Sequence, residues 1–221
     1  MIKSKAWDWD KVKEDKNGSR WMEPSKESYY LIARWKKQNK KEFLDLGCGL
    51  GRHTVQFAKA GFHTYSMDLS ETSVNETKKW CDKEKLNVEF MVSDMLNLPY
   101  DNEKFDCILS YKVINHTDTN GIKQVISELD RVLKPEGEAY LTLNSKESFG
   151  WKQDTPLVDE NTKIKLEPIE ENGIPHFYAD YDLIHELFKG FKIQDILQIQ
   201  ERYKSNEIER ESWNYHILIK K

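Results

Sequence analysis

Apolar residues fall in compact runs between residues 42 and 144, and amphipathic stretches separate these runs. Short apolar runs predict buried strands, and longer stretches with helical spacing predict helices. The predicted strands are Glu42–Leu46, Phe62–Leu69, Val88–Ser93, Phe105–Tyr111 and Ala139–Asn144. The predicted helices are Arg52–Ala60, a segment capped by Ser70 that runs to about Lys85, and Gly121–Leu133. Strands that alternate with helices indicate crossover connections, and therefore a largely parallel sheet covered on both faces.

The pattern changes on both sides of this central region. The first forty residues are charged and rich in tryptophan, and they contain a predicted helix at Ser28–Trp35. Lys134–Gly137 predicts a turn before the last central strand. Between Ser145 and Pro175 apolar residues become sparse, which indicates an excursion over one end of the sheet rather than a second domain.

The C-terminal segment predicts a helix followed by a hairpin. Asp180–Phe188 has helical spacing, and Phe191–Tyr203 and Trp213–Lys220 have strand character. The connection Lys204–Glu211 is short enough for a hairpin, so the last strand should run antiparallel. We expect a single α/β domain over residues 1–221. Its expected parts are an N-terminal helical lid or cap (1–40), a ligand-binding core (41–144), a substrate-side insertion (145–179) and a C-terminal helix and hairpin (180–221).

Composition and charge limit the cellular compartments and the classes of partner that fit this chain. The 221 residues carry a net charge of −4, so the overall charge does not attract nucleic acid. The basic segment Arg34–Lys41 is interpreted as a solvated helix end. Cys48, Cys81 and Cys107 lack metal-ligand spacing, which favours reduced thiols. Because no apolar run resembles a signal peptide or spans a bilayer, we expect a cytoplasmic protein.

Candidate chemistry begins where the first predicted strand gives way to a helix. The segment Asp45-Leu-Gly-Cys-Gly-Leu-Gly51 places three alternating glycines at this point. Glycines let a ligand approach the backbone closely, and free N–H groups at a helix start favour an anionic group. A turn that merely needs small residues is the alternative. Three alternating glycines followed by Arg52, at the edge where parallel sheets bind ligands, favour a ligand loop.

A nicotinamide or flavin dinucleotide site is the main competing interpretation, because such sites use the spacing G-x-G-x-x-G. Counted from Gly47, the third glycine should lie at Arg52, and counted from Gly49 it should lie at Thr54. Neither position holds glycine or alanine. The dinucleotide fingerprint therefore fails in both registers.

Two further acidic residues end the next two predicted strands. Asp68 ends the second strand, where a carboxylate can accept hydrogen bonds from both hydroxyls of a ribose. Asp94 ends the third strand, where it can accept from an exocyclic amine. Each residue alone is more typical of a cap or a solvated loop. Together with Asp45 and the glycine loop, they predict a nucleoside site with a charged tail.

These motifs resemble those of class I S-adenosylmethionine-dependent methyltransferases. Phe43-Leu-Asp-Leu-Gly-Cys-Gly-Leu-Gly-Arg52 matches their first motif closely. Phe105–Tyr111 and Val113–His116 look like their fourth strand and its loop, and Arg131–Gly137 resembles the turn before their fifth strand. Gly173–Tyr178 and the helix after it look like a bacterial and archaeal subset of small members, distantly similar to tellurite-resistance methyltransferases.

The resemblance implies a Rossmann-like three-layer sandwich with a seven-stranded, mostly parallel sheet and an antiparallel last strand. It also implies S-adenosylmethionine as cofactor and S-adenosylhomocysteine as product. In the family's arrangement the glycines line the methionine end, Asp45 orients its amino group, Asp68 holds the ribose, and Asp94 holds the adenine. The implied cofactor-binding residues are Asp45, Gly47, Cys48, Gly49, Gly51, Asp68, Leu69, Asp94, Met95 and Ser110.

The sequence constrains the acceptor less than the cofactor. Members that methylate adenine or cytosine amino groups carry an Asn/Asp-Pro-Pro-aromatic motif after the fourth strand, and this chain has Ser110-Tyr-Lys-Val-Ile-Asn-His116 instead. The Pro-Cys nucleophile used on cytosine carbon is also missing. With the acidic charge, this favours a small-molecule acceptor, no nucleic acid and no membrane partner. Candidate acceptor residues are Tyr111, His116, His176 and Tyr178.

Several alternatives stay open. Capping or packing explains His116 as well as contact with an acceptor does, and aromatic burial explains His176 and Tyr178 somewhat better. No histidine shows ligand spacing, so no metal is expected, and no catalytic base can be named. The N-terminal tryptophans could cover the cofactor or pack against the sheet. A nicotinamide-dependent oxidoreductase and a catalytically silent cofactor binder are the alternative functions.

Overall fold

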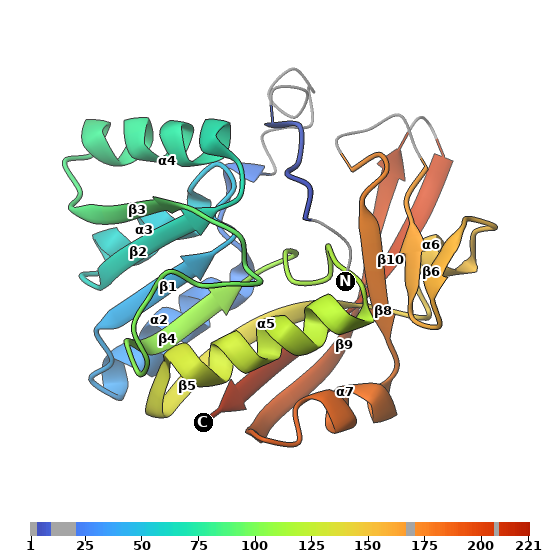
Figure 1. Ribbon diagram of the computed structural model, residues 1–221. Helices are drawn as coiled ribbons and strands as arrows, with labels where there is room; N and C mark the ends of the chain where they lie inside the picture. The colour runs from blue at the N-terminus through green and yellow to red at the C-terminus, as the bar shows by residue number, and fades with distance from the viewer. Residues whose placement is uncertain (1–3, 10–20, 167–170, 206–207) are drawn as a thin grey trace.

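The computed structural model describes residues 4–9, 21–166, 171–205 and 208–221. Its helices are α2 (Lys26–Lys37), α3 (Arg52–Lys59), α4 (Glu71–Lys83), α5 (Thr119–Val132), α6 (Phe149–Lys152) and α7 (Tyr181–Leu187). Its strands are β1 (Glu42–Leu46), β2 (His63–Asp68), β3 (Val88–Val92), β4 (Phe105–Ser110), β5 (Leu133–Ser145), β6 (Leu157–Asp159), β7 (Thr162–Ile164), β8 (Pro175–Ala179), β9 (Lys192–Ser205) and β10 (Ile208–Lys220). Figure 1 shows a twisted sheet with helices on both faces.

The strand order defines where a ligand can bind. Strands β3, β2, β1, β4 and β5 lie side by side in parallel, and β10 lies antiparallel between β5 and β9. The predicted mostly parallel sheet with an antiparallel last strand is confirmed. Chain order reverses between β1 and β4, so the loops after these two strands diverge and leave a crevice at the carboxyl edge.

Alternation along β1 shows how the two faces are filled. Leu44 and Leu46 belong to the cluster that contains the apolar residues of α5 and α7, whereas Phe43 belongs to the cluster of α2 and α3. Phe43 stacks on Phe57 of α3 with ring centroids 3.8 Å apart. Helix α4 contacts α3, β2 and β3. Helices therefore cover both faces of the sheet, and the predicted three-layer sandwich is confirmed.

A buried charge network attaches α2 to the sheet. Glu138 of β5 is buried and accepts hydrogen bonds from Arg34, from the Trp35 indole at 2.8 Å, and from Gln38. Burial alone would raise the pKa of Glu138, but the hydrogen bonds from Arg34 and Trp35 outweigh it and lower the pKa. Trp35 is therefore a core residue of the sandwich and is not part of a lid.

Two predicted connections turn out to be largely strand. Phe105 pairs with Leu133 and Cys107 pairs with Glu138, so residues 134–137 bulge from a continuous β5 instead of preceding it as a separate turn. The predicted hairpin is confirmed, but β9 and β10 are longer than predicted and take up most of residues 204–211. Cross-strand pairing within the long hairpin overrides the polar composition that suggested a loop there.

The excursion after β5 adds strands that the sequence did not predict. Strand β8 pairs with the end of β5 at Asn144 and Ser145, and β7 and β6 continue this edge antiparallel. Within the part of the chain that the structure describes, β6, β7 and β8 thus extend the seven-stranded sheet that the family resemblance implied, β1–β5 with β9 and β10, to ten strands. Figure 1 shows β6 and α6 at the right of the molecule.

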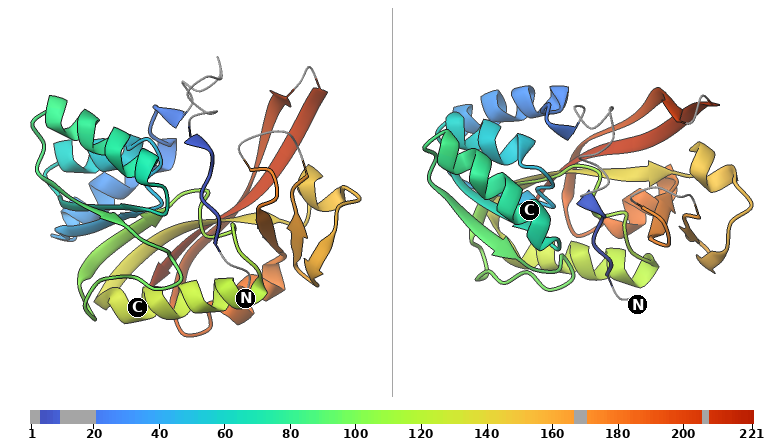
Figure 2. Two further views of the ribbon diagram at one scale, coloured as in Figure 1. Left: turned by 45° about the horizontal axis from the view of Figure 1, so that its top comes forward. Right: turned by 90° about the horizontal axis from the view of Figure 1, so that it is seen from above.

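The N-terminal segment departs from a purely helical lid. Residues 4–8 form no regular secondary structure, and α2 is the helix that follows. The expected lid also includes residues 1–3 and 10–20, which lie outside the described residues. Figure 2 shows the dark blue segment of residues 4–9 crossing the carboxyl edge of the parallel strands. No helix in the described part of the chain is long and apolar enough to cross a membrane.

Candidate functional site

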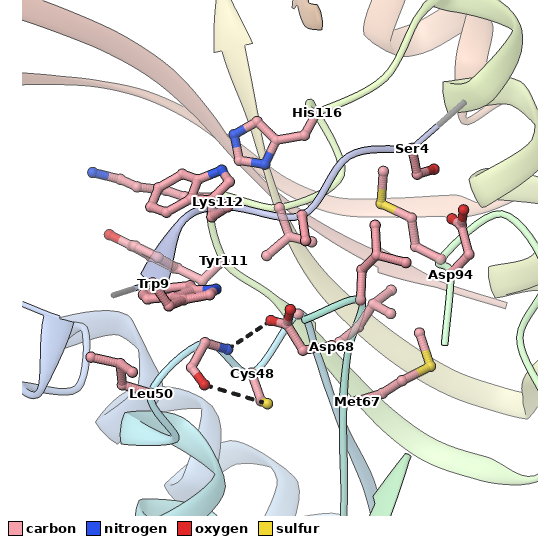
Figure 3. Close-up of a pocket in the computed structure, with 18 of the residues that line it drawn as sticks. Ser4, Trp9, Cys48, Leu50, Met67, Asp68, Asp94, Tyr111, Lys112 and His116 are labelled. Atoms are coloured by element: carbon pink, nitrogen blue, oxygen red, sulfur yellow. Dashed lines mark hydrogen bonds between the residues drawn. The ribbon is translucent and has the colours of Figure 1, made fainter. Parts of the chain in front are cut away.

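A cavity of about 830 Å³, counting its open mouth, lies at the carboxyl edge of β1, β2, β3 and β4. Figure 3 shows Asp68 near its centre, with Trp9 and Tyr111 on one side and Asp94 on the opposite side. The lining residues are Ser4–Trp7, Trp9, Trp21, Leu46–Leu50, Arg52, His53, Met67–Leu69, Ser93–Met95, Tyr111–Val113 and His116.

The glycine loop forms one wall of this cavity and is tightly packed. Gly47 has a φ of +78°, and a Cβ added there would lie 2.3 Å from a methyl carbon of Val113. Gly49 has a φ of +54°, and its added Cβ would lie 2.7 Å from the Trp9 ring. Both the backbone conformation and the available space therefore require glycine at these two positions.

The N–H groups of this loop are engaged within the protein. Those of Gly47 and Cys48 donate to the Met67 carbonyl at 2.7 and 2.9 Å, and that of Gly49 donates to Asp68. The sequence suggested that an anion binds the free N–H groups at the start of the next helix, and these three N–H groups lie before that helix, which begins at Arg52. A ligand can approach the backbone of the loop closely. The side chain of Arg52 places a positive charge next to the loop on the cavity wall.

Asp68 connects the loop to the end of β2. One carboxylate oxygen accepts from Gly49 N–H at 2.9 Å, and the other accepts from Ser70 N–H at 2.9 Å. Burial raises the pKa of Asp68, and these two N–H groups oppose part of the rise. The sequence predicted a carboxylate at the end of the second strand, on the edge of the sheet where a ligand binds. Asp68 lies at this position.

Asp94 and Met95 line the far end of the cavity beyond β3. Asp94 accepts a hydrogen bond from Leu96 N–H at 3.0 Å, which fixes the turn after the strand. Ser93 N–H donates to the Asp68 carbonyl at 3.1 Å. This bond keeps the loops after β2 and β3 side by side, so both carboxylates lie at the same edge.

Three residues of the expected cofactor-binding set do not line the cavity. Asp45 points behind the loop and accepts from the Thr54 hydroxyl at 2.6 Å, and its complete burial raises its pKa to about 6. The Ser110 hydroxyl donates to the Leu46 carbonyl at 3.1 Å. Gly51 starts α3 against the side chain of Thr77. Strand alternation and helix packing turn these residues toward the core, so they support the loop from behind.

The N-terminal arm, residues 4–9, contributes lining residues that the sequence could only suggest through its tryptophans. The Trp7 ring lies 5.3 Å from the Trp9 ring and 5.3 Å from the His116 ring. The Arg52 guanidinium lies 5.3 Å from the Trp21 ring and 5.4 Å from that of Tyr111. The Trp7 indole N–H is buried with no hydrogen-bond partner among the described residues, which marks a polar spot at the cavity wall.

The family of the central region follows from comparison with known proteins. Residues 43–137 match the family model described as "Methyltransferase domain". These residues form a methyltransferase domain. The methyltransferase domain contains the glycine loop, Asp68, Asp94 and the loop after β4, which together make most of the cavity.

The names of relatives of the methyltransferase domain refer to different substrates. The tRNA (carboxymethyluridine(34)-5-O)-methyltransferase of Arabidopsis thaliana is 33% identical over 129 residues, which is 58% of this chain and 29% of that protein. The ubiquinone biosynthesis O-methyltransferase of Coxiella burnetii is 26% identical over 102 residues, 46% of this chain and 43% of that protein. The matches thus cover less than half the length of these relatives.

Solved structures share the fold over most of the chain. An S-adenosylmethionine-dependent methyltransferase of Methanosarcina mazei superposes with a TM-score of 0.70 at 18% identity, covering 86% of this chain and 96% of that one. The Rossmann-like fold inferred from the sequence is confirmed. The expectation that nucleic acid is excluded as an acceptor finds no support, because one relative named above is a tRNA methyltransferase.

The four candidate acceptor residues separate into two groups. Tyr111 and His116 line the cavity of the methyltransferase domain, whereas His176 and Tyr178 do not. Tyr178 packs on Trp151 of α6 with ring centroids 5.4 Å apart.

His116 is buried, and desolvation lowers its pKa to about 4, although Glu171 opposes that shift. The imidazole of His116 is therefore neutral near pH 7.

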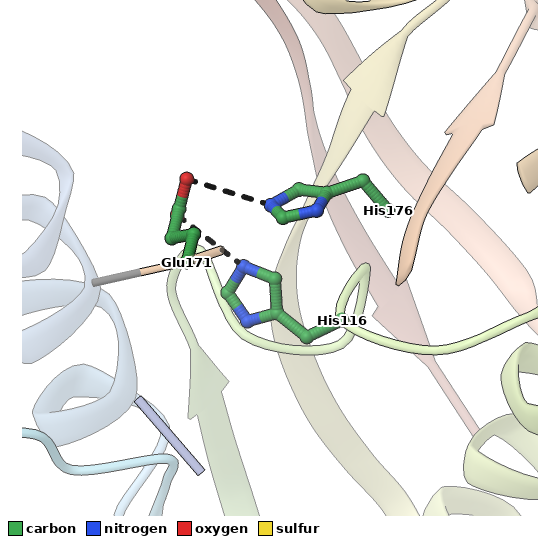
Figure 4. A group of neighbouring side chains, drawn as sticks. All are labelled: His116, Glu171 and His176. Atoms are coloured by element: carbon green, nitrogen blue, oxygen red, sulfur yellow. Dashed lines mark ion pairs between the residues drawn. The ribbon is translucent and has the colours of Figure 1, made fainter. Parts of the chain in front are cut away.

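Beside the cavity, His176 meets His116 through a residue that the sequence did not single out. Figure 4 shows Glu171 facing both imidazoles. Its carboxylate oxygens lie 3.7 Å from His116 Nε2 and 3.6 Å from His176 Nε2. Burial alone would raise the pKa of Glu171, but His176, His116 and Lys165 hold it well below its usual value. No spacing signal could have revealed this group, since its members come from separate segments.

Proposed function

We propose that the protein transfers a methyl group from S-adenosylmethionine to an acceptor that enters the cavity beside His116. The observation that supports this most is the common cavity wall of Gly47–Gly49, Asp68 and Asp94, within a methyltransferase domain. A nicotinamide site is disfavoured because the loop lacks the third glycine and the family match is to methyltransferases.

The residues of this cavity fit the proposed cofactor. Asp68 presents a carboxylate suited to ribose hydroxyls, and Asp94 with Met95 lies where an adenine would contact the end of β3. Gly47 and Gly49 bring the loop backbone to the cavity wall, and Arg52 on the same wall would supply a cation for the carboxylate of a methionine chain. S-adenosylmethionine, when bound, supplies an already activated methyl group.

The protein's own contribution is then alignment and removal of water. The rings of Trp7, Trp9 and Tyr111 line the cavity together with the glycine loop and His116, so an acceptor held there would displace water from these aromatic surfaces. Holding two reactants in a fixed geometry can contribute up to about 7–11 kcal/mol to lowering a barrier. A general base matters only if the acceptor must lose a proton.

Calorimetric titration with S-adenosylmethionine, S-adenosylhomocysteine and NADH tests the cofactor assignment. We expect saturable binding of the first two and none of NADH. Asp68→Ala should weaken binding about 10- to 100-fold, because a hydrogen-bonded charge is lost. Asp68→Asn, which keeps the shape and one acceptor, should lose less, and Asp82→Ala on the exposed face of α4 should match the unchanged protein. Binding of NADH alone would overturn the proposal.

A small-molecule acceptor is the second part of the proposal, supported by the cavity beside the glycine loop and the net charge of −4. Methyl-labelled S-adenosylmethionine can be incubated with the protein and either low-molecular-weight cell extract or total tRNA. We expect label in the small-molecule fraction. Label in tRNA alone would contradict this part while leaving the methyltransferase assignment intact, and label in neither would favour a silent binder.

A further inference from the structure

The group formed by His116, Glu171 and His176 has no role in the cofactor site proposed above. His116 comes from the loop after β4, Glu171 from the turn before β8, and His176 from β8 itself. One ligand-type atom of each residue lies within 4.8 Å of the other two. All three side chains are at most 13% exposed, which is uncommon for ionisable groups without a binding or structural reason.

The distances between these side chains fit coordination better than direct hydrogen bonding. Glu171 lies 3.7 Å from His116 Nε2 and 3.6 Å from His176 Nε2, and hydrogen bonds at such lengths are weak or not formed. Two ligands bound at about 2.0–2.1 Å by a tetrahedral ion lie roughly 3.3 Å apart. Small side-chain shifts would therefore bring all three residues to one ion.

The tautomer of His176 gives independent support. Its Nδ1 lies 3.0 Å from the Ile174 carbonyl oxygen, and a carbonyl can only accept, so Nδ1 carries the proton. Nε2 is then the ring nitrogen that faces the Glu171 carboxylate and the one available to bind an ion. Metal-binding histidines commonly donate their second N–H to a backbone carbonyl in this way.

We propose that His116, Glu171 and His176 bind a divalent transition-metal ion, with Zn²⁺ as the best match. Two imidazoles and one carboxylate are a ligand set typical of catalytic zinc, which leaves a fourth position for water or substrate. The nitrogen ligands disfavour Mg²⁺ and Ca²⁺, which prefer oxygen. Lys165 pairs with the same oxygen of Glu171 that faces His176, so the oxygen facing His116 carries most of the coordination.

This site deepens the proposed function and rests on it for its role. His116 belongs both to the metal ligands and to the cavity wall, so the ion lies next to the acceptor space. A bound divalent ion lowers the pKa of a coordinated hydroxyl or thiol. An acceptor hydroxyl or thiol held there would lose its proton to water. A lone pair of its heteroatom would then form the bond to the methyl carbon, while the bond from that carbon to the sulfonium sulfur breaks and leaves its electron pair on the sulfur of S-adenosylhomocysteine. The inferred acceptor class is thus a small molecule with a hydroxyl or thiol group.

The N-terminal arm connects this site to the cofactor cavity. Lys5 of the arm donates to the Asn172 carbonyl at 2.8 Å, next to the residue that supplies the carboxylate. Trp7 of the same arm packs against His116. Metal ligands, arm and cavity therefore form one contiguous wall.

Zinc binding to the full chain is measured directly, after treatment with a chelator and buffer exchange, by calorimetric titration with ZnCl₂ and by elemental analysis. We expect one ion per chain. Glu171→Gln and His176→Ala should each weaken binding at least tenfold. Mg²⁺ at the same concentration should not compete.

His63→Ala is the matched control, because His63 is an exposed histidine between two carboxylates, Glu42 and Glu89, each 3.0 Å away. Its affinity for Zn²⁺ should equal that of the unchanged protein. Absence of binding, or an affinity unchanged in both Glu171→Gln and His176→Ala, would overturn the inference. Loss of binding in His63→Ala alone would place the ion at the surface and overturn it equally.

A parallel titration with S-adenosylhomocysteine separates this inference from the proposed function. We expect the nucleoside to bind the metal-free protein and to bind Glu171→Gln with unchanged affinity, which also shows that this variant is folded. Nucleoside binding without zinc binding would overturn only the metal site. Zinc binding without nucleoside binding would keep the metal site and overturn the methyltransferase proposal.

Discussion

At the scale of single residues, Asp45 and Asp68 end adjacent strands but meet different surroundings. Asp68 lines the cavity and accepts two backbone N–H groups. Asp45 faces the opposite side of β1 and has the hydroxyl of Thr54 as a partner, with Ser66 next to Thr54. Burial favours the protonated form of a carboxyl group, and at Asp45 it outweighs the opposing effects of Thr54 and Arg52. The two residues should therefore differ in how they respond to pH.

Asp45→Asn tests this difference. Burial raises the folded-state pKa of Asp45 to about 6, above an unfolded value of about 3.9, so ionisation costs stability as pH rises through this window. Between pH 4 and 7.5 the free energy of unfolding of the unchanged protein should fall by about 1–3 kcal/mol relative to that of Asp45→Asn. Urea unfolding across this pH range measures the difference.

The control for this experiment is Asp82→Asn, at a position on α4 that is 61% exposed. Its free energy of unfolding should follow that of the unchanged protein throughout the pH range. A constant difference between Asp45→Asn and the unchanged protein would show that Asp45 is not a neutral buried group.

At the scale of elements, the N-terminal arm and the glycine loop depend on each other. Trp9 is 8% exposed and packs on Gly49, while Leu50 shares its small apolar cluster. The arm has little regular hydrogen bonding, so these side-chain contacts are what keep it over the cavity. A ligand that fills the space beside Gly49 must therefore touch or move Trp9.

Trp9→Phe should show this coupling in tryptophan fluorescence. We expect S-adenosylhomocysteine to change the emission of the unchanged protein, and Trp9→Phe to lose more than half of that change. Trp80→Phe, in α4 and not among the lining residues, should keep it. An equal signal in Trp9→Phe and the unchanged protein would mean that the cofactor binds without contacting the arm.

At the scale of the whole molecule, β10 holds the C-terminal half of the sheet together. Residues Asn214–Lys220 pair with β5 on one side and with β9 on the other. Ile217 and Ile219 are completely buried. Earlier in β10, residues Ile208–Trp213 pair with β9, and pairing with β5 begins at Asn214, so the hairpin extends past the edge of β5. Figure 2 shows this extension.

Removal of the paired half of β10 and shortening of the hairpin should therefore affect thermal stability very differently. Removal of residues 213–221 leaves β5 and β9 with unpaired edges and exposes the core, so cooperative thermal unfolding should be lost. Replacement of residues 203–210 by Asn-Gly joins Arg202 to its partner Glu211 and should shift the melting temperature by only a few degrees. Similar melting curves for both variants would contradict this account of β10.

Much of the site could be anticipated because its signals are local. The glycine spacing, the acidic strand ends and the alternation of strand and helix each lie within a few residues of sequence, and these placed Gly47, Asp68 and Asp94 at one edge. The sequence does not determine which way a side chain points at the end of a strand. For this reason Asp45 and Ser110 were expected at the ligand and instead face the core.

The sequence by itself determined the class of fold and the edge at which a ligand binds, because hydrophobic period and turn chemistry act over short distances along the chain. Only the tertiary structure decided which distant residues meet there. The N-terminal arm reaches the glycine loop, and Glu171 reaches His116, through contacts that span tens of residues. No local pattern encodes such contacts, since they form only when the sheet has brought its loops to one edge.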